Sequence, residues 1–169
     1  MREVFRLPKT LLEIPHIQDL LSFAEDVLQA SDRAEVSPVL DGSLAVQAYT
    51  SDPEIEVRDM DLNCPEASFG GLRTALDDAG IFCEIQPWRV LQARRDGLKV
   101  EFGATEEWLK GIDGPYEQLL LPNGRVVQMV SRDDLVHLYR RGFTATDGLP
   151  DEVEKHVHIE SRLKALQAL

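Results

Sequence analysis

The spacing of apolar residues predicts a helix near the start of the chain. Between positions 17 and 28 they recur with the period of an amphipathic helix that buries one face: Ile17, Leu20, Leu21, Ala24, Val27 and Leu28. We expect this helix to end near Ala30. Residues 1–15 contain Pro8 and Pro15 and are predicted to form an extended arm.

The following segment alternates short apolar stretches with helical ones. The pattern predicts strands at 37–41, 56–63 and 81–86, and helices at 43–49 and 68–79. Residues 90–93 are also apolar, and we expect them to extend or continue the strand of 81–86 past Pro87. A chain that alternates in this way folds as a sheet covered by helices.

Turn signals in the second half of the sequence predict two hairpins. Asp96-Gly97 is a typical hairpin turn and leads into an alternating strand at 98–102. A short helix is expected at 106–110. Strands at 116–121 and 125–130 flank the turn residues Pro122-Asn123-Gly124 and form the second hairpin.

The C-terminal part of the chain is predicted to be helical. Ser131 and Asp134 have the spacing of a capping box, with Asp in the usual Glu position, so a helix is expected from there to Arg141, closed by Gly142. A last helix is predicted to begin at Asp151. Its apolar residues are expected to face inward, namely Val153, Val157, Leu163 and Leu166.

These elements predict an α/β or α+β fold with a mixed sheet flanked by helices. The chain has 169 residues, of which 43% are hydrophobic, as in an ordinary globular protein. We therefore expect one domain over 1–169, with a core at about 36–130. The arm and helix of 1–30 and the helices of 131–168 would surround that core.

Two carboxylates stand on one of the predicted strands. Alternate residues of a strand point to the same face, so Asp59 and Asp61 project together while Met60 and Leu62 enter the core. Neighbouring carboxylates repel each other, and a cation between them relieves the repulsion. Asp-x-Asp is a frequent pattern, and two exposed acids on an acidic protein would look the same.

A glycine-serine pair after the first core strand supports the metal interpretation. Gly42 lets a phosphate approach the backbone, and a helix that opens at Ser43 offers free N–H groups to it. Ser43 could equally be a plain helix cap, and the two roles are compatible. A phosphate cradle facing paired carboxylates is the equipment for phosphoryl or nucleotidyl transfer.

Charge and cysteine content narrow the choice of partners. The formal net charge is −12, which disfavours a bound nucleic acid but does not exclude a nucleotide held through a metal. Two cysteines are too few for a disulfide framework or a Cys-based zinc site. No apolar run approaches the ~18 residues of a membrane span, so we expect a protein of the cytoplasm with no membrane partner.

The motifs resemble the signature of the DNA-polymerase-beta-like nucleotidyltransferase superfamily. Leu40-Asp41-Gly42-Ser43 precedes Asp59-Met60-Asp61-Leu62 in the order of that signature, and the fifteen residues between Ser43 and Asp59 indicate an enlarged loop. With the run at 42–49 and Arg58, the sequence looks most like small bacterial members near the AbiEii-type toxins. Such a protein could belong to a toxin–antitoxin pair.

The resemblance implies a reaction and a set of site residues. A nucleoside monophosphate would pass from an NTP to an acceptor hydroxyl on a small molecule or a protein, with Mg²⁺ or Mn²⁺ as cofactor. Asp59, Asp61 and Glu101 would hold the metal ions; Gly42, Ser43 and Lys99 would bind the nucleotide. Glu101 lies on a later strand where the family usually has Asp, and Lys99 shares its face.

Two other functions fit the same residues. The chain could be an inactive member of the fold that binds or regulates a protein partner, and Glu101 would then be a solvated strand residue. It could also be a metal-dependent phosphohydrolase in which water replaces the acceptor. A homodimer or a partner that covers residues 1–30 could supply a missing wall of the site.

Overall fold

Eight strands form one mixed sheet in the computed structural model, which describes residues 3–145 and 151–168. Their order across the sheet is β1-β7-β8-β2-β3-β6-β5-β4. Three neighbouring pairs are parallel, β1 with β7, β2 with β8 and β3 with β6, and the others are antiparallel. The strands are β1 (Val4–Arg6), β2 (Val39–Asp41), β3 (Met60–Cys64), β4 (Phe82–Gln86), β5 (Val90–Arg95), β6 (Leu98–Ala104), β7 (Glu117–Leu120) and β8 (Val126–Met129).

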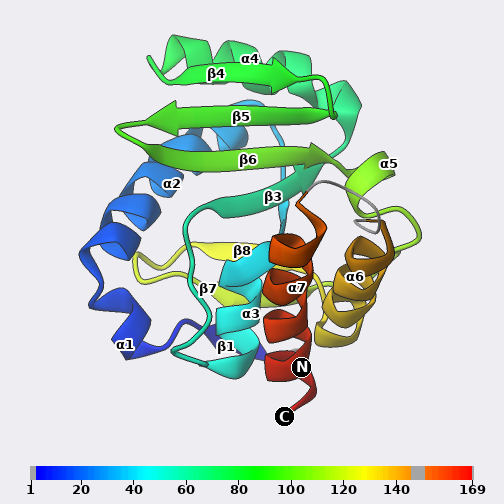
Figure 1. The fold of residues 1–169 in the computed structure, drawn as a ribbon. Helices are drawn as coiled ribbons and strands as arrows, with labels where there is room; N and C mark the ends of the chain where they lie inside the picture. The colour runs from blue at the N-terminus through cyan, green and yellow to red at the C-terminus, as the bar shows by residue number, and fades with distance from the viewer. Residues whose placement is uncertain (1–2, 146–150, 169) are drawn as a thin grey trace.

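The helices lie on both faces of the sheet. Figure 1 shows α2 passing behind β5 and β6, and α4 behind β4, whereas α3, α6 and α7 lie in front of the lower strands. No helix of the described residues has the length and apolar character to cross a membrane. The helices are α1 (Lys9–Leu12), α2 (Pro15–Arg33), α3 (Gly42–Thr50), the 3-10 turn η1 (Glu66–Ser68), α4 (Phe69–Asp78), α5 (Thr105–Trp108), α6 (Arg132–Ala145) and α7 (Glu152–Gln167).

The central strands are apolar on the faces that the helices cover. Met60 and Leu62 of β3 are buried, as are Val100 and Phe102 of β6, so alternation places their neighbours on the opposite face. The predicted mixed α/β architecture is confirmed, and the alternation predicted for these two strands holds in the structure.

Several local predictions are also confirmed. β5 and β6 form a hairpin around Asp96 and Gly97, and β7 pairs with β8 as the second hairpin. At the start of α6, the Asp134 amide donates to the Ser131 hydroxyl at 3.2 Å, which is the expected cap. The N-terminal arm is only partly extended, because β1 joins the sheet edge beside β7 and α1 follows it.

The prediction for residues 90–93 was wrong. They belong to β5, a separate strand antiparallel to β4, and do not continue it. The chain reverses at 87–89, where the Arg89 amide donates to the Gln86 carbonyl at 3.1 Å and Arg89 takes a positive φ of 64°. The reversal places Trp88 at the end of the sheet.

The strand that carries the two aspartates begins later than predicted. It starts at Met60, and side chains donate to two of the carbonyl groups before it. His16 Nε2 donates to the Arg58 carbonyl at 2.9 Å, and Arg162 Nη2 donates to the Glu56 carbonyl at 3.2 Å. Residues 51–59 therefore form a loop whose backbone is held by side-chain hydrogen bonds, and Asp59 is its last residue.

The two C-terminal helices also differ from the prediction. α6 continues through Gly142 to Ala145, so this glycine does not close it. In α7, Val153 and Val157 are 80% and 62% exposed, so the expected inward face was wrong there. The buried side of α7 instead carries Ile159, Arg162, Ala165 and Leu166.

Candidate active site

The predicted carboxylates meet where β3 lies beside β6. Asp61 and Glu101 are paired residues of these parallel strands, so both side chains leave the sheet at the same level. Asp59 lies two residues before Asp61, at the end of the loop of residues 51–59. The ammonium group of Lys99 joins them, with Nζ 3.6 Å from Asp59 Oδ2 and 3.5 Å from Glu101 Oε1.

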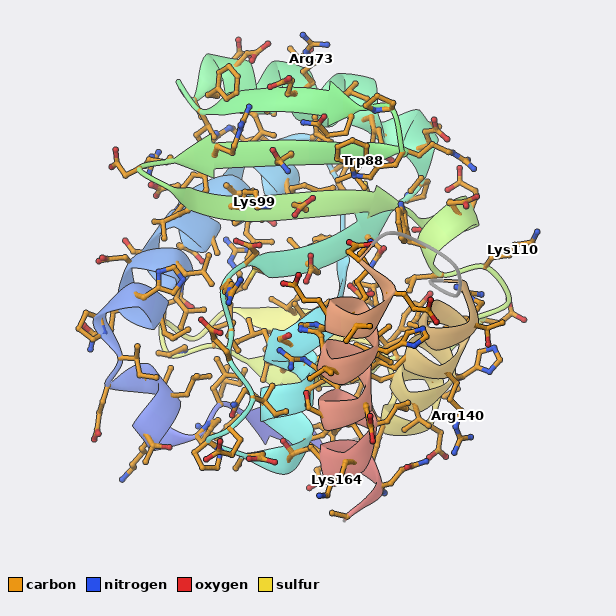
Figure 2. All side chains as sticks on the ribbon, in the orientation of Figure 1. Arg73, Trp88, Lys99, Lys110, Arg140 and Lys164 are labelled. Carbon is orange, nitrogen blue, oxygen red and sulfur yellow. The ribbon has the colours of Figure 1, made fainter. Side chains whose placement is uncertain are left out.

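Lys99 supplies the positive charge of this cluster. Burial disfavours its ammonium form, but Glu101 and Asp59 together keep its pKa above the ordinary value. Figure 2 shows Lys99 on β6 and Trp88 near the start of β5. Lys99 and Glu101 share a face, as predicted, and Lys99 contacts carboxylates directly. Its predicted contact with the nucleotide stays a prediction.

A further carboxylate, which the sequence analysis did not select, lies beside Asp61. Asp41 is the antiparallel partner of Asp61 in β2, and Asn63 Nδ2 donates to Asp41 Oδ1 at 3.0 Å. Burial raises the pKa of Asp41 to about 6, although the bond from Asn63 opposes the rise. Burial, and then the charges of Asp41, Glu101 and Asp59, raise the pKa of Asp61 well above its usual range.

The phosphate cradle predicted at Gly42 lies against the same carboxylate. Gly42 begins α3 with a positive φ of 71°, and a Cβ atom placed on it would overlap Oδ2 of Asp61. Only glycine allows this approach of the α3 N-terminus to Asp61. The turn and the carboxylates are thus parts of one site.

We predict that Gly42→Ala disrupts the site as well as the backbone. A side chain at this φ costs about 1–2 kcal/mol, or a fall in Tm of roughly 2–8 °C for a chain of this length. The displaced Asp61 should in addition abolish any response to nucleotide. Gly80→Ala is the matched control, because Gly80 has φ +72° and open space around its Cβ position. Equal losses of stability and nucleotide response in both variants would contradict the prediction.

Two cavities open on either side of the carboxylates. The larger, about 560 Å³, runs from Gly42 and Ser43 to α6 and α7. Its walls include Asp41, Asp61, Trp108, Tyr139 and His158. The smaller, about 170 Å³, is lined by the carboxylates of Asp41, Asp61 and Glu101 and by the indole rings of Trp88 and Trp108. Asp41, Asp61 and Trp108 border both cavities, which therefore meet at the carboxylates.

The aromatic walls were missed by the sequence analysis. Trp88 and Trp108 are 53% and 43% exposed, and Trp108 Nε1 donates to the Trp88 carbonyl at 3.2 Å. Tyr139 of α6 is hydrogen-bonded to Ser43, and burial followed by the nearby Asp41 and Asp61 raises its pKa. The sequence pattern does not mark these aromatic residues as part of a site, because only the fold brings the turn and the helices together.

The donor set suits a hard cation. Carboxylate oxygens are the ligands that Mg²⁺ and Mn²⁺ prefer. After burial, the charges of Asp41, Glu101 and Asp59 raise the pKa of Asp61, and such an ion would relieve this repulsion. Within residues 3–145 and 151–168, no three His, Cys, Asp or Glu side chains are already arranged around one point as a metal cluster. Lys99 lies between two of the candidate ligands, so it would have to move when an ion binds.

Comparison with known proteins gives a family and a fold. Residues 24–128 match the sequence profile of the aminoglycoside-2''-adenylyltransferases, which is more than half of the chain. A search of curated proteins found no match.

Solved structures of nucleotidyltransferases share the fold. The solution structure of the antibiotic-resistance factor ANT(2'')-Ia has a TM-score of 0.59 and 16% identity, over 89% of this chain and 90% of that one. A nucleotidyltransferase-like protein from Paracoccidioides brasiliensis has a TM-score of 0.60 and 17% identity, over 88% and 75%. The lincosamide adenylyltransferase LnuA with bound lincomycin has a TM-score of 0.51 and 14% identity, over 86% and 97%.

Proposed function

The chain belongs to the aminoglycoside-2''-adenylyltransferase family, and on this premise we propose that it transfers a nucleoside monophosphate from an NTP to a hydroxyl group of a small cationic acceptor. The observation that carries the proposal is the meeting of Gly42, Asp61 and Glu101 between two cavities. The nucleotidyltransferase superfamily predicted from the motifs is confirmed by the family match. The narrower resemblance to AbiEii-type proteins stays a prediction.

We assign the larger cavity to the nucleotide. Gly42 and Ser43 open α3 there, so free backbone N–H groups face the place where phosphates would lie. Asp59 and Asp61 would hold Mg²⁺ or Mn²⁺. When bound, the metal would neutralise charge on the triphosphate and lower the pKa of the acceptor hydroxyl.

We assign the smaller cavity to the acceptor. It contains three carboxylates and two indole rings, and none of the Lys or Arg side chains in the described part of the chain lines it. Carboxylates attract ammonium groups, and an indole ring offers a flat face for a sugar ring or a cation. An amino sugar has both features, and the related ANT(2'')-Ia has been solved with adenylyl-2''-tobramycin. Aminoglycosides are therefore the first acceptors to test.

The reaction assigns one task to each residue. The acceptor oxygen attacks the α-phosphorus as the bond to the β-phosphate oxygen breaks and pyrophosphate leaves. Glu101, which lines the acceptor cavity, would take the hydroxyl proton and complete the metal site. Gly42 and Ser43 would hold the leaving phosphates. Most of the rate would come from positioning and charge neutralisation.

The first experiment is thermal unfolding with Mg²⁺ and each NTP. Ligand at ~100 times its Kd stabilises a protein by about 2.7 kcal/mol, which for this chain length is a rise in Tm of roughly 5–10 °C. We expect this rise in the wild type and its loss in Asp59→Asn. Release of pyrophosphate that requires an added aminoglycoside would then establish transfer. Pyrophosphate or phosphate released without an acceptor would indicate a phosphohydrolase instead.

One observation favours the inactive alternative. The ammonium group of Lys99 already lies between Asp59 and Glu101 and offsets part of their charge, so the chain is able to keep these acids together without an ion. In an inactive binding module, neither nucleotide nor metal would change the Tm of the wild type. That result would remove the enzyme proposal and direct the search to a protein partner or a second copy of the chain.

A further inference from the structure

A buried arginine from the last helix reaches the phosphate cradle. Arg162 of α7 is 7% exposed. Its Nη2 donates to Ser43 Oγ at 3.3 Å and to the Glu56 carbonyl at 3.2 Å. Its Nη1 donates to Ser161 Oγ at 2.8 Å. One guanidinium thus connects α7 with the first turn of α3 and with the loop of residues 51–59.

The charge of Arg162 is expensive to bury. Arginine is rarely enclosed unless a carboxylate pairs with it, and within residues 3–145 and 151–168 none lies within ion-pair distance of it. Its Nε–H has no hydrogen-bond partner in the same residues. A buried guanidinium without a carboxylate partner does not contribute enough to the stability of the fold to explain its presence. Its position beside a cradle for anionic phosphates offers a reason.

The hydrogen bond to Ser43 also fixes how that hydroxyl is used. A guanidinium has only donors, so Ser43 Oγ accepts from Arg162 and its own proton remains for another acceptor. Tyr139 is the nearby hydroxyl, and a phosphate oxygen in the larger cavity would be the other candidate. Ser43 therefore donates to Tyr139 in the free protein, and the same proton would be available to a bound phosphate.

The second contact holds the loop that carries Asp59. From α3, Gln47 Nε2 donates to the carbonyls of Asp52 at 2.6 Å and Ile55 at 2.7 Å. Arg162 adds the Glu56 carbonyl, the next one along the chain. With His16 of α2 on the Arg58 carbonyl, three helices hold the loop before Asp59, and Arg162 is the contribution of α7.

We propose that Arg162 is a positioning residue of the nucleotide site, which holds Ser43 and the loop of 51–59 in the geometry that receives a triphosphate and places a positive charge behind that cradle. This inference rests on the proposed function for its ligand. It assigns to α7 a part in nucleotide binding through a residue that lies behind the cavity wall.

The test compares Arg162→Met with Arg132→Met. Arg132 also fastens α7, since its Nε donates to the Leu166 carbonyl at 2.9 Å, at the end of the helix away from Ser43. We expect Arg162→Met to raise the Kd for ATP with Mg²⁺ by about 10-fold or more, the usual cost of a lost charged hydrogen bond. KM for ATP should rise more than kcat falls. Arg132→Met should lower Tm and leave that Kd unchanged.

Conservative variants separate positioning from general destabilisation. Arg162→Lys keeps the positive charge but loses the planar set of N–H donors that a guanidinium offers. We therefore expect a Kd for ATP between those of the wild type and Arg162→Met. In a double-mutant cycle with Ser43→Ala, the losses of ATP affinity in the two single variants should not be additive, because each substitution removes the same Arg162–Ser43 contact. If Arg162→Met does not fold, Arg162→Lys and the cycle built on it give the answer.

A measurement without nucleotide keeps the two proposals distinguishable. Hydrogen exchange of residues 51–59 in the free protein should be faster in Arg162→Met than in Arg132→Met. If the wild type binds no ATP, the proposed function fails, and the exchange experiment still decides whether Arg162 holds the loop. Unchanged exchange, or an Arg162→Met protein that binds ATP within two-fold of the wild type, would overturn the inference.

Discussion

Glu101→Gln should reduce kcat for nucleotidyl transfer by about 10²–10⁴-fold, the range for loss of a general base, with little change in the Kd for ATP and Mg²⁺. The substitution keeps the size of the side chain and removes its charge and its ability to take a proton. Glu101 lines the acceptor cavity and pairs with Asp61 across the parallel strands, so its loss affects the acceptor side of the reaction. Single-turnover rates at saturating nucleotide measure the effect on chemistry directly.

Two other variants make the Glu101 result interpretable. Glu84→Gln is the matched control, since Glu84 is a strand glutamate in β4 that pairs with Arg94 at 2.6 Å. It should transfer at the wild-type rate. Glu101→Asp tests how far the carboxylate must extend from the strand, because Asp has one methylene less. This variant should retain more activity than Glu101→Gln. A Glu101→Gln protein with wild-type kcat would show that another group takes the proton, and Asp41 would be the next candidate.

The part of the site that follows from strand alternation could be predicted from the sequence. Alternation puts Lys99 and Glu101 on one face of β6 and Asp61 on the matching face of β3, while Asp59 joins them from the end of the loop of 51–59. That Glu101 would lie beside the aspartates was implied by the family resemblance, which puts an acid on a later strand. Gly42 could be found because a left-handed turn before a helix favours glycine. The face on which each of these side chains lies, and the glycine of the turn, depend on neighbours in the chain, which a sequence displays.

The parts that depend on pairing between distant segments could not be predicted. Asp41 was read only as the end of a strand, and its position beside Asp61 follows from the register of β2 on β3. Trp88 reaches the site because the chain reverses at 87–89, where the sequence analysis expected a continuous strand. Register and strand order are set by the whole core, and a local pattern does not contain them.

Arg162 shows a different limit of sequence reasoning. Helical periodicity is judged from apolar residues, and this criterion favoured Val153 and Val157, which are exposed. The buried face of α7 contains an arginine instead. A charged residue on a buried face is invisible to a hydrophobic pattern, and it is found only when its contacts are known. Such exceptions tend to lie at functional sites, where local rules give way to chemistry.

Asp61→Asn should strongly reduce transfer and at the same time stabilise the free protein at neutral pH. Loss of one electrostatic stabiliser of the transition state lowers kcat by about 10²–10³-fold or more. The stability gain arises because Asp61 and Asp41 lie side by side, with burial raising the pKa of both and the charge of Asp41 raising the pKa of Asp61 further. Asparagine resembles the neutral acid in shape and removes that repulsion.

The sign of the pH dependence follows from the direction of these pKa values. Asp41 titrates near pH 6 in the folded chain against 3.8 for the free side chain, so folding favours its protonated form. The resulting stabilisation is complete below about pH 4 and is lost as pH rises through 6, on the order of 2–3 kcal/mol for this one residue. The wild type without metal should therefore be less stable at pH 7.5 than at pH 5.

Urea unfolding at pH 5 and pH 7.5 tests this expectation. Asp61→Asn should exceed the wild type in free energy of unfolding at pH 7.5 and match it more closely at pH 5. Asp113→Asn, which removes an exposed carboxylate, is the control and should follow the wild type at both values. MgCl₂ at pH 7.5 should stabilise the wild type and leave Asp61→Asn unchanged, because the ion replaces the proton as the partner of the ionised pair. Equal stability of Asp61→Asn and the wild type at both pH values would mean that the carboxylates do not repel each other, and the physical argument for a cation between them would fall.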